Sequence, residues 1–170
     1  MELIIGAGND TNKKITFEAI PDEWTEMITL DIDPTTNPSV CHDLNNLPLP
    51  FDDDMFDEIH AYEVLEHTGR QGDWMFFFDQ FSELHRILKP GGHLIGTCPM
   101  WDSPWAWGDP GHTRIISKES LTYLIQAEYE KQVGNNAMTD YRGYYKADFE
   151  LVAAQEKGDT FGFVLKAIKE

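Results

Sequence analysis

Basic residues are scarce in this 170-residue sequence. Its 13 Lys and Arg are outnumbered by 30 Asp and Glu, which gives a formal net charge of −17 at pH 7. A field of that sign repels polyanions, so DNA, RNA and anionic membrane surfaces are disfavoured as partners. The acidity itself has two open interpretations: it serves solubility alone, or it favours a cationic substrate.

Long apolar runs are also missing. No stretch approaches the roughly 20 apolar residues that a membrane-spanning helix needs. The first ten residues, MELIIGAGND, lack the basic region of a secretory signal and lead directly into an apolar run. We therefore expect no membrane span and a cytoplasmic location.

Cysteine is nearly absent, and no repeat, low-complexity tract or linker interrupts the sequence. Cys41 and Cys98 show no CxxC spacing and fall in or beside predicted strands, which predicts buried, reduced thiols. The length and a hydrophobic content of 41% suit one domain over residues 1–170.

The most informative passage that is present covers residues 83–99, ELHRILKPGGHLIGTCP. A helix-compatible segment, residues 83–89, meets Pro90-Gly91-Gly92, which cannot extend a helix and suits a sharp turn. An apolar run of strand length, residues 93–98, follows at once. This order of helix, turn and strand is half of an α/β repeat.

The rest of the sequence extends this pattern. Aromatic and aliphatic residues spaced in threes and fours predict a helix over residues 72–88, and Ser117 can cap another that runs to residue 131. The other predicted strands are residues 3–5, 27–32, 39–44 and 56–62, and a terminal hairpin of residues 149–154 and 161–168. We expect an α/β fold, with a doubly wound, mostly parallel sheet that ends in an antiparallel hairpin.

A glycine turn and a strand-end acid predict a nucleotide site. In an open parallel sheet the ligand lies beyond the carboxyl ends of the strands, and Gly6-Ala7-Gly8 would let it approach the backbone. Asp31 closes the second strand, where a carboxylate can accept hydrogen bonds from two ribose hydroxyls. Its alternative role is an Asx turn before Pro34. Thr11 stands where a dinucleotide fingerprint needs a third glycine, which counts against an NAD-linked oxidoreductase.

Three potential metal ligands follow the fourth strand. Glu63, Glu66 and His67 lie within one turn of one another if the segment is helical, so two carboxylates and an imidazole could converge on a hard cation. Two alternatives remain open. The residues line the pocket without a metal, or they have only a structural role.

A tryptophan-rich segment, residues 100–114, follows the fifth strand. Trp101, Trp105 and Trp107 could stack on an aromatic or cationic substrate, or pack onto the sheet or onto another copy of the chain in a homo-oligomer. His112 is the candidate general base in this segment, because the unperturbed pKa of histidine lies near neutrality.

Three passages resemble class I S-adenosylmethionine (SAM) methyltransferases. They are NNLPLPFDDDMFDEI at residues 45–59, EVLEH at residues 63–67 and HRILKPGG at residues 85–92. The resemblance covers roughly residues 3–116 and indicates the compact branch of the family, since residues 9–23 are too short for much of the usual first helix. It implies a Rossmann-like fold, SAM as the cofactor and methyl transfer to an acceptor. The acceptor is not identified by the sequence: we expect a small molecule, and a sugar, a lipid head group and a protein side chain remain open.

The resemblance also implies roles for individual residues. Asp43 would accept from the adenine amino group while the backbone of Leu44 meets the ring edge, although Asp43 could also serve only as a loop cap. His67 and His112 would face the acceptor as catalytic residues. The implied cofactor-binding residues are Gly6, Ala7, Gly8, Asp31, Asp43, Leu44 and Glu63.

The E-x-x-E-H motif also resembles the corresponding motif of ubiquinone-pathway O-methyltransferases and small-RNA 2′-O-methyltransferases. Those relatives bind a divalent ion at the corresponding positions, which here implies Glu63, Glu66, His67 and His112. Ile4 and Asp10 depart from the acid and the glycine that the family usually places there. A non-catalytic or partner-dependent subunit is therefore the alternative function.

Overall fold

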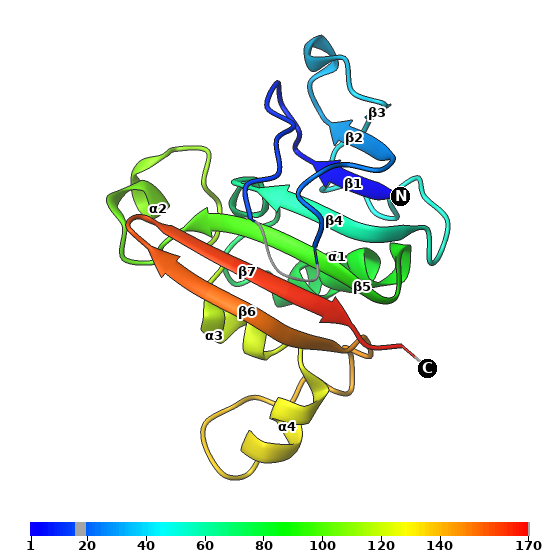
Figure 1. Cartoon of the computed structure of the whole chain (residues 1–170). Helices are drawn as coiled ribbons and strands as arrows, with labels where there is room; N and C mark the ends of the chain where they lie inside the picture. The colour runs from blue at the N-terminus through cyan, green and yellow to red at the C-terminus, as the bar shows by residue number, and fades with distance from the viewer. Residues whose placement is uncertain (16–19, 170) are drawn as a thin grey trace.

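The computed structural model describes residues 1–15 and 20–169. Seven strands form one sheet in the order β3-β2-β1-β4-β5-β7-β6 (Figure 1). Strands β1 to β5 pair in parallel, whereas β7 is antiparallel to both β5 and β6. The strands are β1 (Glu2–Ile5), β2 (Met27–Asp31), β3 (Val40–Cys41), β4 (Phe56–Tyr62), β5 (Leu88–Pro99), β6 (Phe149–Lys157) and β7 (Thr160–Ala167). The predicted doubly wound sheet with a terminal hairpin is confirmed.

The edge strand β3 is shorter than expected. The sequence predicted a strand over residues 39–44, but only Val40 and Cys41 pair with β2. Because this edge has no further neighbour within the described residues, Cys41 is exposed, and the prediction that it is buried is wrong. Cys98, in the interior strand β5, is buried as expected.

Strand β5 also begins earlier than its sequence suggested. Leu88 pairs with Phe56 and His93 with Glu58, so five steps along β5 lie opposite two steps along β4. The extra residues include Gly91, whose φ of 75° is in the left-handed region that glycine tolerates. The Pro-Gly-Gly passage is therefore an irregularity inside the strand span and not a separate turn before it.

The structure contains two short 3-10 helices and four α-helices within the described residues. They are η1 (Pro34–Thr36), η2 (Leu65–His67), α1 (Trp74–Ile87), α2 (Pro104–Gly108), α3 (Lys118–Thr122) and α4 (Gln126–Gln132). Ser117 caps α3 as predicted, but the single helix expected to residue 131 is two helices. The break occurs where the Tyr123 carbonyl accepts from the Tyr129 hydroxyl at 2.8 Å and the Gln126 amide donates to Asp148 at 2.8 Å.

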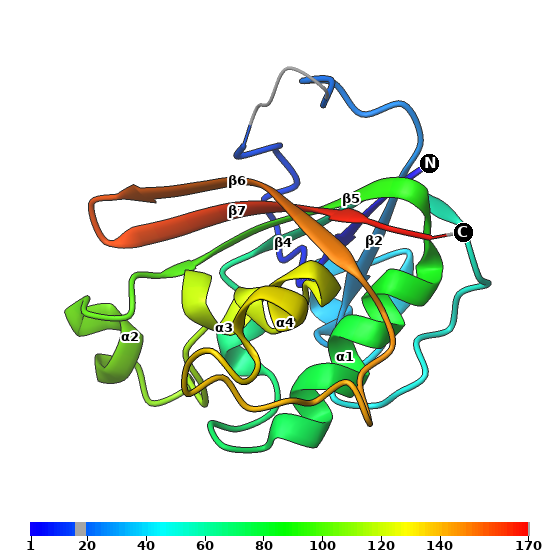
Figure 2. The same cartoon turned by 90° about the horizontal axis from the view of Figure 1, so that it is seen from below.

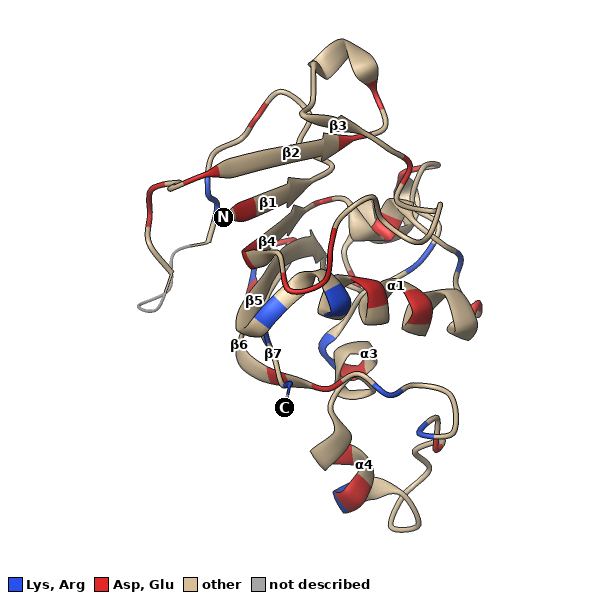
Figure 3. Cartoon of the chain, turned by 90° about the vertical axis from the view of Figure 1, so that its right-hand side faces the viewer, with Lys and Arg blue, Asp and Glu red and all other residues tan. Residues whose placement is uncertain are grey.

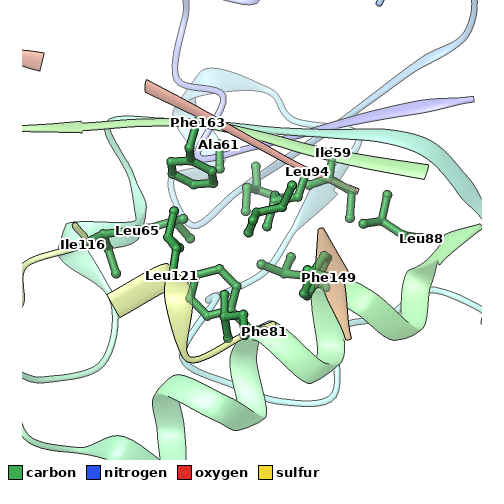
Figure 4. Packing of buried hydrophobic residues seen from close by; sticks show 14 of the residues in the cluster. Ile59, Ala61, Leu65, Phe81, Leu88, Leu94, Ile116, Leu121, Phe149 and Phe163 are labelled. Carbon is green, nitrogen blue, oxygen red and sulfur yellow. The ribbon is translucent and has the colours of Figure 1, made fainter. Parts of the chain in front are cut away.

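Helices cover one face of the sheet. Figure 2 shows α1, α3 and α4 on the same side, and Figure 4 shows Phe81 of α1 and Leu121 of α3 between these helices and the strands. Both side chains are fully buried with Ile59, Ala61 and Leu94 in the larger core cluster. Burial of such aliphatic and aromatic groups is the main driving force for this packing.

The opposite face carries no α-helix within the described residues. The connection between β1 and β2 covers it instead, where Ile20 packs with Ile4, Ile95 and Val164, and Trp24 borders the same cluster (Figure 2). Residues 16–19 of the short passage 9–23 lie outside the described residues. In its described residues this connection contains no helix.

Charge is spread unevenly over this framework. Acidic positions occur along the connections and on α1, α3 and α4, and basic positions are few (Figure 3). Across residues 1–15 and 20–169, no helix combines the length and apolar character needed to cross a membrane.

Candidate functional site

The turn after β1 is pressed against the loop after β4. Gly6 has a φ of 61°, and a Cβ atom there would lie 2.3 Å from Cγ2 of Val64. A side chain at this position would be both strained and excluded by contact. Gly6 therefore permits the carboxyl ends of β1 and β4 to meet closely.

Asp31 ties this turn to the end of β2. Its Oδ2 accepts a hydrogen bond from the Gly8 amide at 2.8 Å, and its Oδ1 accepts one from the Asp33 amide at 2.8 Å. The second contact is the Asx turn that the sequence offered as an alternative role. Each carboxylate oxygen can accept more than one hydrogen bond, so the group retains capacity for a ligand.

Asp43 and Leu44 follow β3 at the same edge of the sheet. Oδ1 of Asp43 accepts from the backbone and side-chain nitrogens of Asn45 at 2.8 and 2.9 Å, so its alternative role as a loop cap is realised. Leu44 is buried in the main core. Asn45 in turn accepts from the Gly69 amide at 2.8 Å, which links this loop to the segment after η2.

A cleft of about 400 Å³ opens where these loops meet. It brings together Gly6, Asp31, Asp43, Leu44 and His67 of the predicted site residues. Ala7, Gly8 and Glu63 do not line this cleft, although Gly8 is bonded to Asp31.

Six residues that line the cleft were not predicted as site residues, and four of them are Leu30, Ile32, His42 and Asn45. Val64 and Thr68 also line it. Val64 stood inside the EVLEH passage, and Thr68 follows it directly. The glycine at position 6 was the only sequence signal that a bulky side chain approaches that turn.

Glu63 has an unusual backbone conformation at the end of β4. Its φ is 50°, and its amide donates to the Thr97 carbonyl at 2.9 Å. A left-handed conformation costs a non-glycine residue free energy and often marks a functional site. The conformation begins the sharp change of direction that leads from β4 into η2.

Glu66, His67 and His112 form the one cluster of potential metal ligands among the described residues. One ligand atom from each lies within 4.8 Å of the others. The imidazole rings of His67 and His112 are 4.6 Å apart in an edge-to-face arrangement. Glu63, which was also expected here, does not belong to this cluster.

Two members of this cluster hold buried polar atoms without a partner. Glu66 is 2% exposed, and neither of its carboxylate oxygens makes a hydrogen bond with a described residue. Nδ1 of His112 is likewise buried without one. Buried polar atoms are almost always paired, so each exception requires an explanation.

Backbone contacts hold His112 beside Glu66, 46 positions earlier in the chain. The Thr113 amide donates to the Glu66 carbonyl at 2.8 Å, and Nε of Arg114 donates to the Leu65 carbonyl at 2.9 Å. Nη2 of the same arginine donates to Thr68 at 2.8 Å and also to Gln80. The buried Arg114 guanidinium therefore fastens the tryptophan-rich segment to η2.

Burial shifts the acidity of the groups around this cluster. It raises the pKa of Glu66 to about 7, and the neighbouring Glu63 carboxylate adds to the shift. Burial and the same Glu66 carboxylate raise the pKa of the Cys98 thiol. Burial also lowers the pKa of the Arg114 guanidinium to about 10. The largest cause of all three shifts is the same, the removal of water from charged groups.

The tryptophan-rich segment contains a short helix, α2, capped by Ser103. Trp101, Trp105 and Trp107 are 57%, 64% and 69% exposed, so the alternative in which they pack onto the sheet is wrong. Their predicted contacts with a substrate or with another copy of the chain remain predictions.

The glycine turn and the two strand-end acids around one cleft are the arrangement expected of a nucleotide-binding α/β protein. Residues 15–96 match the model of a family described as methyltransferase domain. A search of curated proteins found no match. In the partial family match and in its fold, the chain is similar to the class I SAM-dependent methyltransferases, whose cofactor is SAM.

Solved structures show the same fold. A chain from the complex of the Haloferax volcanii Trm112 methyltransferase activator is 15% identical, with 99% of this chain and 82% of that chain covered and a TM-score of 0.61. The N-methyltransferase NodS from Bradyrhizobium japonicum, in complex with S-adenosyl-L-homocysteine (SAH), is 16% identical over 99% and 78%, with a TM-score of 0.60. A SAM-dependent methyltransferase from Archaeoglobus fulgidus is 15% identical over 97% and 85%, with a TM-score of 0.58.

The buried carboxyl of Glu66 is expected to make stability depend on pH. Its pKa is raised from 4.5 to about 7, so the native state keeps a proton that the unfolded chain releases. The free energy of unfolding should therefore fall as the pH rises from about 4.5 to 7. With EDTA present, Glu66→Gln should raise the free energy of unfolding at pH 8 by up to about 3 kcal/mol and change it little at pH 4.

Urea denaturation at both pH values measures this difference. Glu130→Gln, which changes an exposed glutamate on α4, is the matched control and should leave the free energy of unfolding unchanged at either pH. Equal stabilities of the wild type and Glu66→Gln at pH 8 would show that the carboxyl carries no such shift.

Proposed function

We propose that this chain transfers the methyl group of SAM to a small-molecule acceptor. The observation that carries the proposal is the cleft at the carboxyl ends of β1, β2 and β3, where Gly6, Asp31 and Asp43 meet. The family match supports the reaction class. The net charge of −17 argues against a nucleic-acid acceptor.

The residues around the cleft suit the parts of the cofactor. Asp31 would accept from the ribose hydroxyls, and Asp43 from the adenine amino group, beside the backbone of Leu44. The Gly6-Ala7-Gly8 turn would receive the methionine end. Glu63 lies outside this cleft, so its expected part in cofactor binding rests on its place directly after β4.

Bound SAM supplies an electrophilic methyl group on a sulfonium. What the chain contributes is positioning, because a displacement at carbon depends on the alignment of the reacting groups. A base is needed only when the acceptor atom carries a proton. Nδ1 of His67 lies 3.1 Å from the Gly111 carbonyl, which can only accept, so Nδ1 carries the hydrogen and Nε2 keeps its lone pair. His67 is thus the better placed base, because it also lines the cleft.

Glu66, His67 and His112 form a candidate site for a divalent metal ion. The unpartnered buried oxygens of Glu66 and the unpartnered Nδ1 of His112 fit such an ion, which would supply the missing partners. The carboxylate suits a hard ion such as Mn²⁺, and the two imidazoles suit a borderline ion such as Zn²⁺. If Nε2 of His67 binds the ion, that atom is no longer available as a base, so the two roles exclude each other.

Methyl transfer is tested with SAM that carries a labelled methyl group. The chain is incubated with a cell extract separated into small molecules, protein and nucleic acid, and the label is followed into each fraction. We expect it among the small molecules. Label that appears only in protein or nucleic acid would contradict the proposed acceptor class.

Replacement of Asp31 should weaken cofactor binding. Asp31→Asn keeps the size of the side chain but loses the charge, so the dissociation constant for SAH should rise by about tenfold or more. Calorimetric titration with SAH measures the change. Asp33→Asn is the matched control, because Asp33 only caps η1 and asparagine can replace it there. Equal affinities of both variants would remove Asp31 from the site.

Removal of the metal site should abolish ion binding. After dialysis against EDTA, the wild type should take up one equivalent of Mn²⁺ in a calorimetric titration, and Glu66→Ala should show no measurable binding. Glu63→Gln should bind Mn²⁺ as the wild type does, since Glu63 lies outside the ligand cluster. Absence of Mn²⁺ binding by the wild type would instead favour the pocket-lining role of these residues.

A partner-dependent methyltransferase subunit is the second candidate function. One similar structure comes from a complex with the Trm112 methyltransferase activator, which favours this alternative. An isolated chain that binds SAH but transfers no label to any fraction would support it over the first proposal.

A further inference from the structure

A buried polar network lies on the sheet face that carries no α-helix among the described residues. Glu58, His60 and Tyr62 alternate along β4, so their side chains share this face. Nε2 of His60 lies 2.9 Å from a Glu58 oxygen, and Nδ1 lies 2.7 Å from the Tyr62 hydroxyl. His60 is fully buried, and Glu58 and Tyr62 are nearly so.

Lys13 enters this network from the connection between β1 and β2. Its ammonium donates to the same Glu58 oxygen at 2.8 Å and to the Pro21 carbonyl at 2.8 Å. The Lys13 side chain is only 2% exposed. The ammonium lies 4.7 Å from the centre of the Trp24 ring, whose indole nitrogen donates to the Thr11 carbonyl at 2.8 Å. Residues of the β1–β2 connection therefore surround the Lys13 side chain, which belongs to the same connection.

The hydrogen-bond directions in this network follow from the donors. Glu58 receives a charged donor from Lys13 and an N–H from His60, so the proton of His60 sits on Nε2. Nδ1 then accepts from the Tyr62 hydroxyl. Every polar group is satisfied in one arrangement, which specifies the position of the connection more sharply than apolar packing would.

The anchored connection continues directly from the glycine turn of the cofactor cleft. Gly8, which donates to Asp31, precedes Lys13 by five positions. Lys14 reaches back to Asp10 at 3.4 Å and lies 5.6 Å from the centre of the Tyr62 ring. Residues 8–14 are thus held at Asp31 on one side and along β4 on the other.

We propose that Lys13 is a positioning residue for cofactor binding. Its ion pair with Glu58, supported by His60 and Tyr62, holds the loop of residues 8–14 and with it the adjoining Gly6-Ala7-Gly8 turn, which would receive the methionine end of SAM. The network sets the position of this loop in a connection whose described residues form no helix. This inference rests on the proposed function, since it names what orders the same cleft.

The test compares SAH binding by Lys13→Met and Lys13→Arg, well below their melting temperatures. Met keeps the apolar stem but leaves Glu58 without its cation, so the dissociation constant for SAH should rise by about tenfold. Arg keeps the charge and should restore most of the affinity. Lys131→Met is the matched control, because Lys131 is 67% exposed in its side chain and lies on α4 outside this loop, so this variant should bind SAH nearly as the wild type does.

A second comparison separates positioning from a general loss of stability. Phe149→Leu, in the core at the far end of β6, should lower the melting temperature without changing the affinity for SAH. If Lys13→Met does not fold, the double variant Lys13→Gln, Glu58→Gln replaces the ion pair by a neutral hydrogen bond. That variant is expected to fold and to show the same loss of affinity.

Two results would overturn the inference in different ways. A wild type that binds SAH, with Lys13→Met or the double variant binding equally well, contradicts the positioning role and leaves the proposed function intact. A wild type that binds neither SAH nor SAM contradicts the proposed function itself, and the inference that rests on it.

Discussion

The missing side chain at Gly6 is the constraint on which the candidate site depends. Because Val64 occupies the space that a Cβ atom would need, the first turn and the loop after β4 can form one wall of the cleft. Asp31 then bonds to Gly8 and brings the end of β2 into the same wall. The candidate cofactor contacts on three strands therefore depend on one close backbone approach.

A second set of contacts places the residues that would face the acceptor. The Thr113 amide and the Arg114 guanidinium hold the tryptophan-rich segment against the backbone of η2, which brings His112 next to Glu66. The carboxyl group of Glu66, which is buried without a hydrogen-bond partner, lies near the exposed His67. This buried group without a partner lies just after β4, close in sequence to Glu63 with its strained backbone.

The fold class and most strands could be predicted from sequence, because apolar runs and turn residues are local signals. Asp31 and Asp43 were predicted as site residues for the same reason, since Asp31 ends β2 and Asp43 closely follows β3. What could not be predicted depends on distant contacts. The break between α3 and α4 follows from bonds to Asp148 and between two tyrosines, and the early start of β5 follows from pairing with Phe56.

The metal cluster shows the same limit within one motif. Sequence spacing grouped Glu63 with Glu66 and His67, but the left-handed backbone of Glu63 and the 3-10 conformation of η2 replace the helical turn on which that spacing relied. No sequence signal predicted the ion pair of Lys13 with Glu58, because Glu58 lies 45 positions away on β4.

The position of β7 has a consequence for how the chain acquires its fold. β7 lies between β5 and β6, so β6 is made before the strand that joins it to the sheet. On a ribosome, β6 must wait without a paired neighbour until residue 167 has emerged, while β1 to β5 can already pair. The hairpin strand β6 can therefore join the sheet only with β7 or after it, so the order of synthesis runs opposite to the order of pairing at this edge.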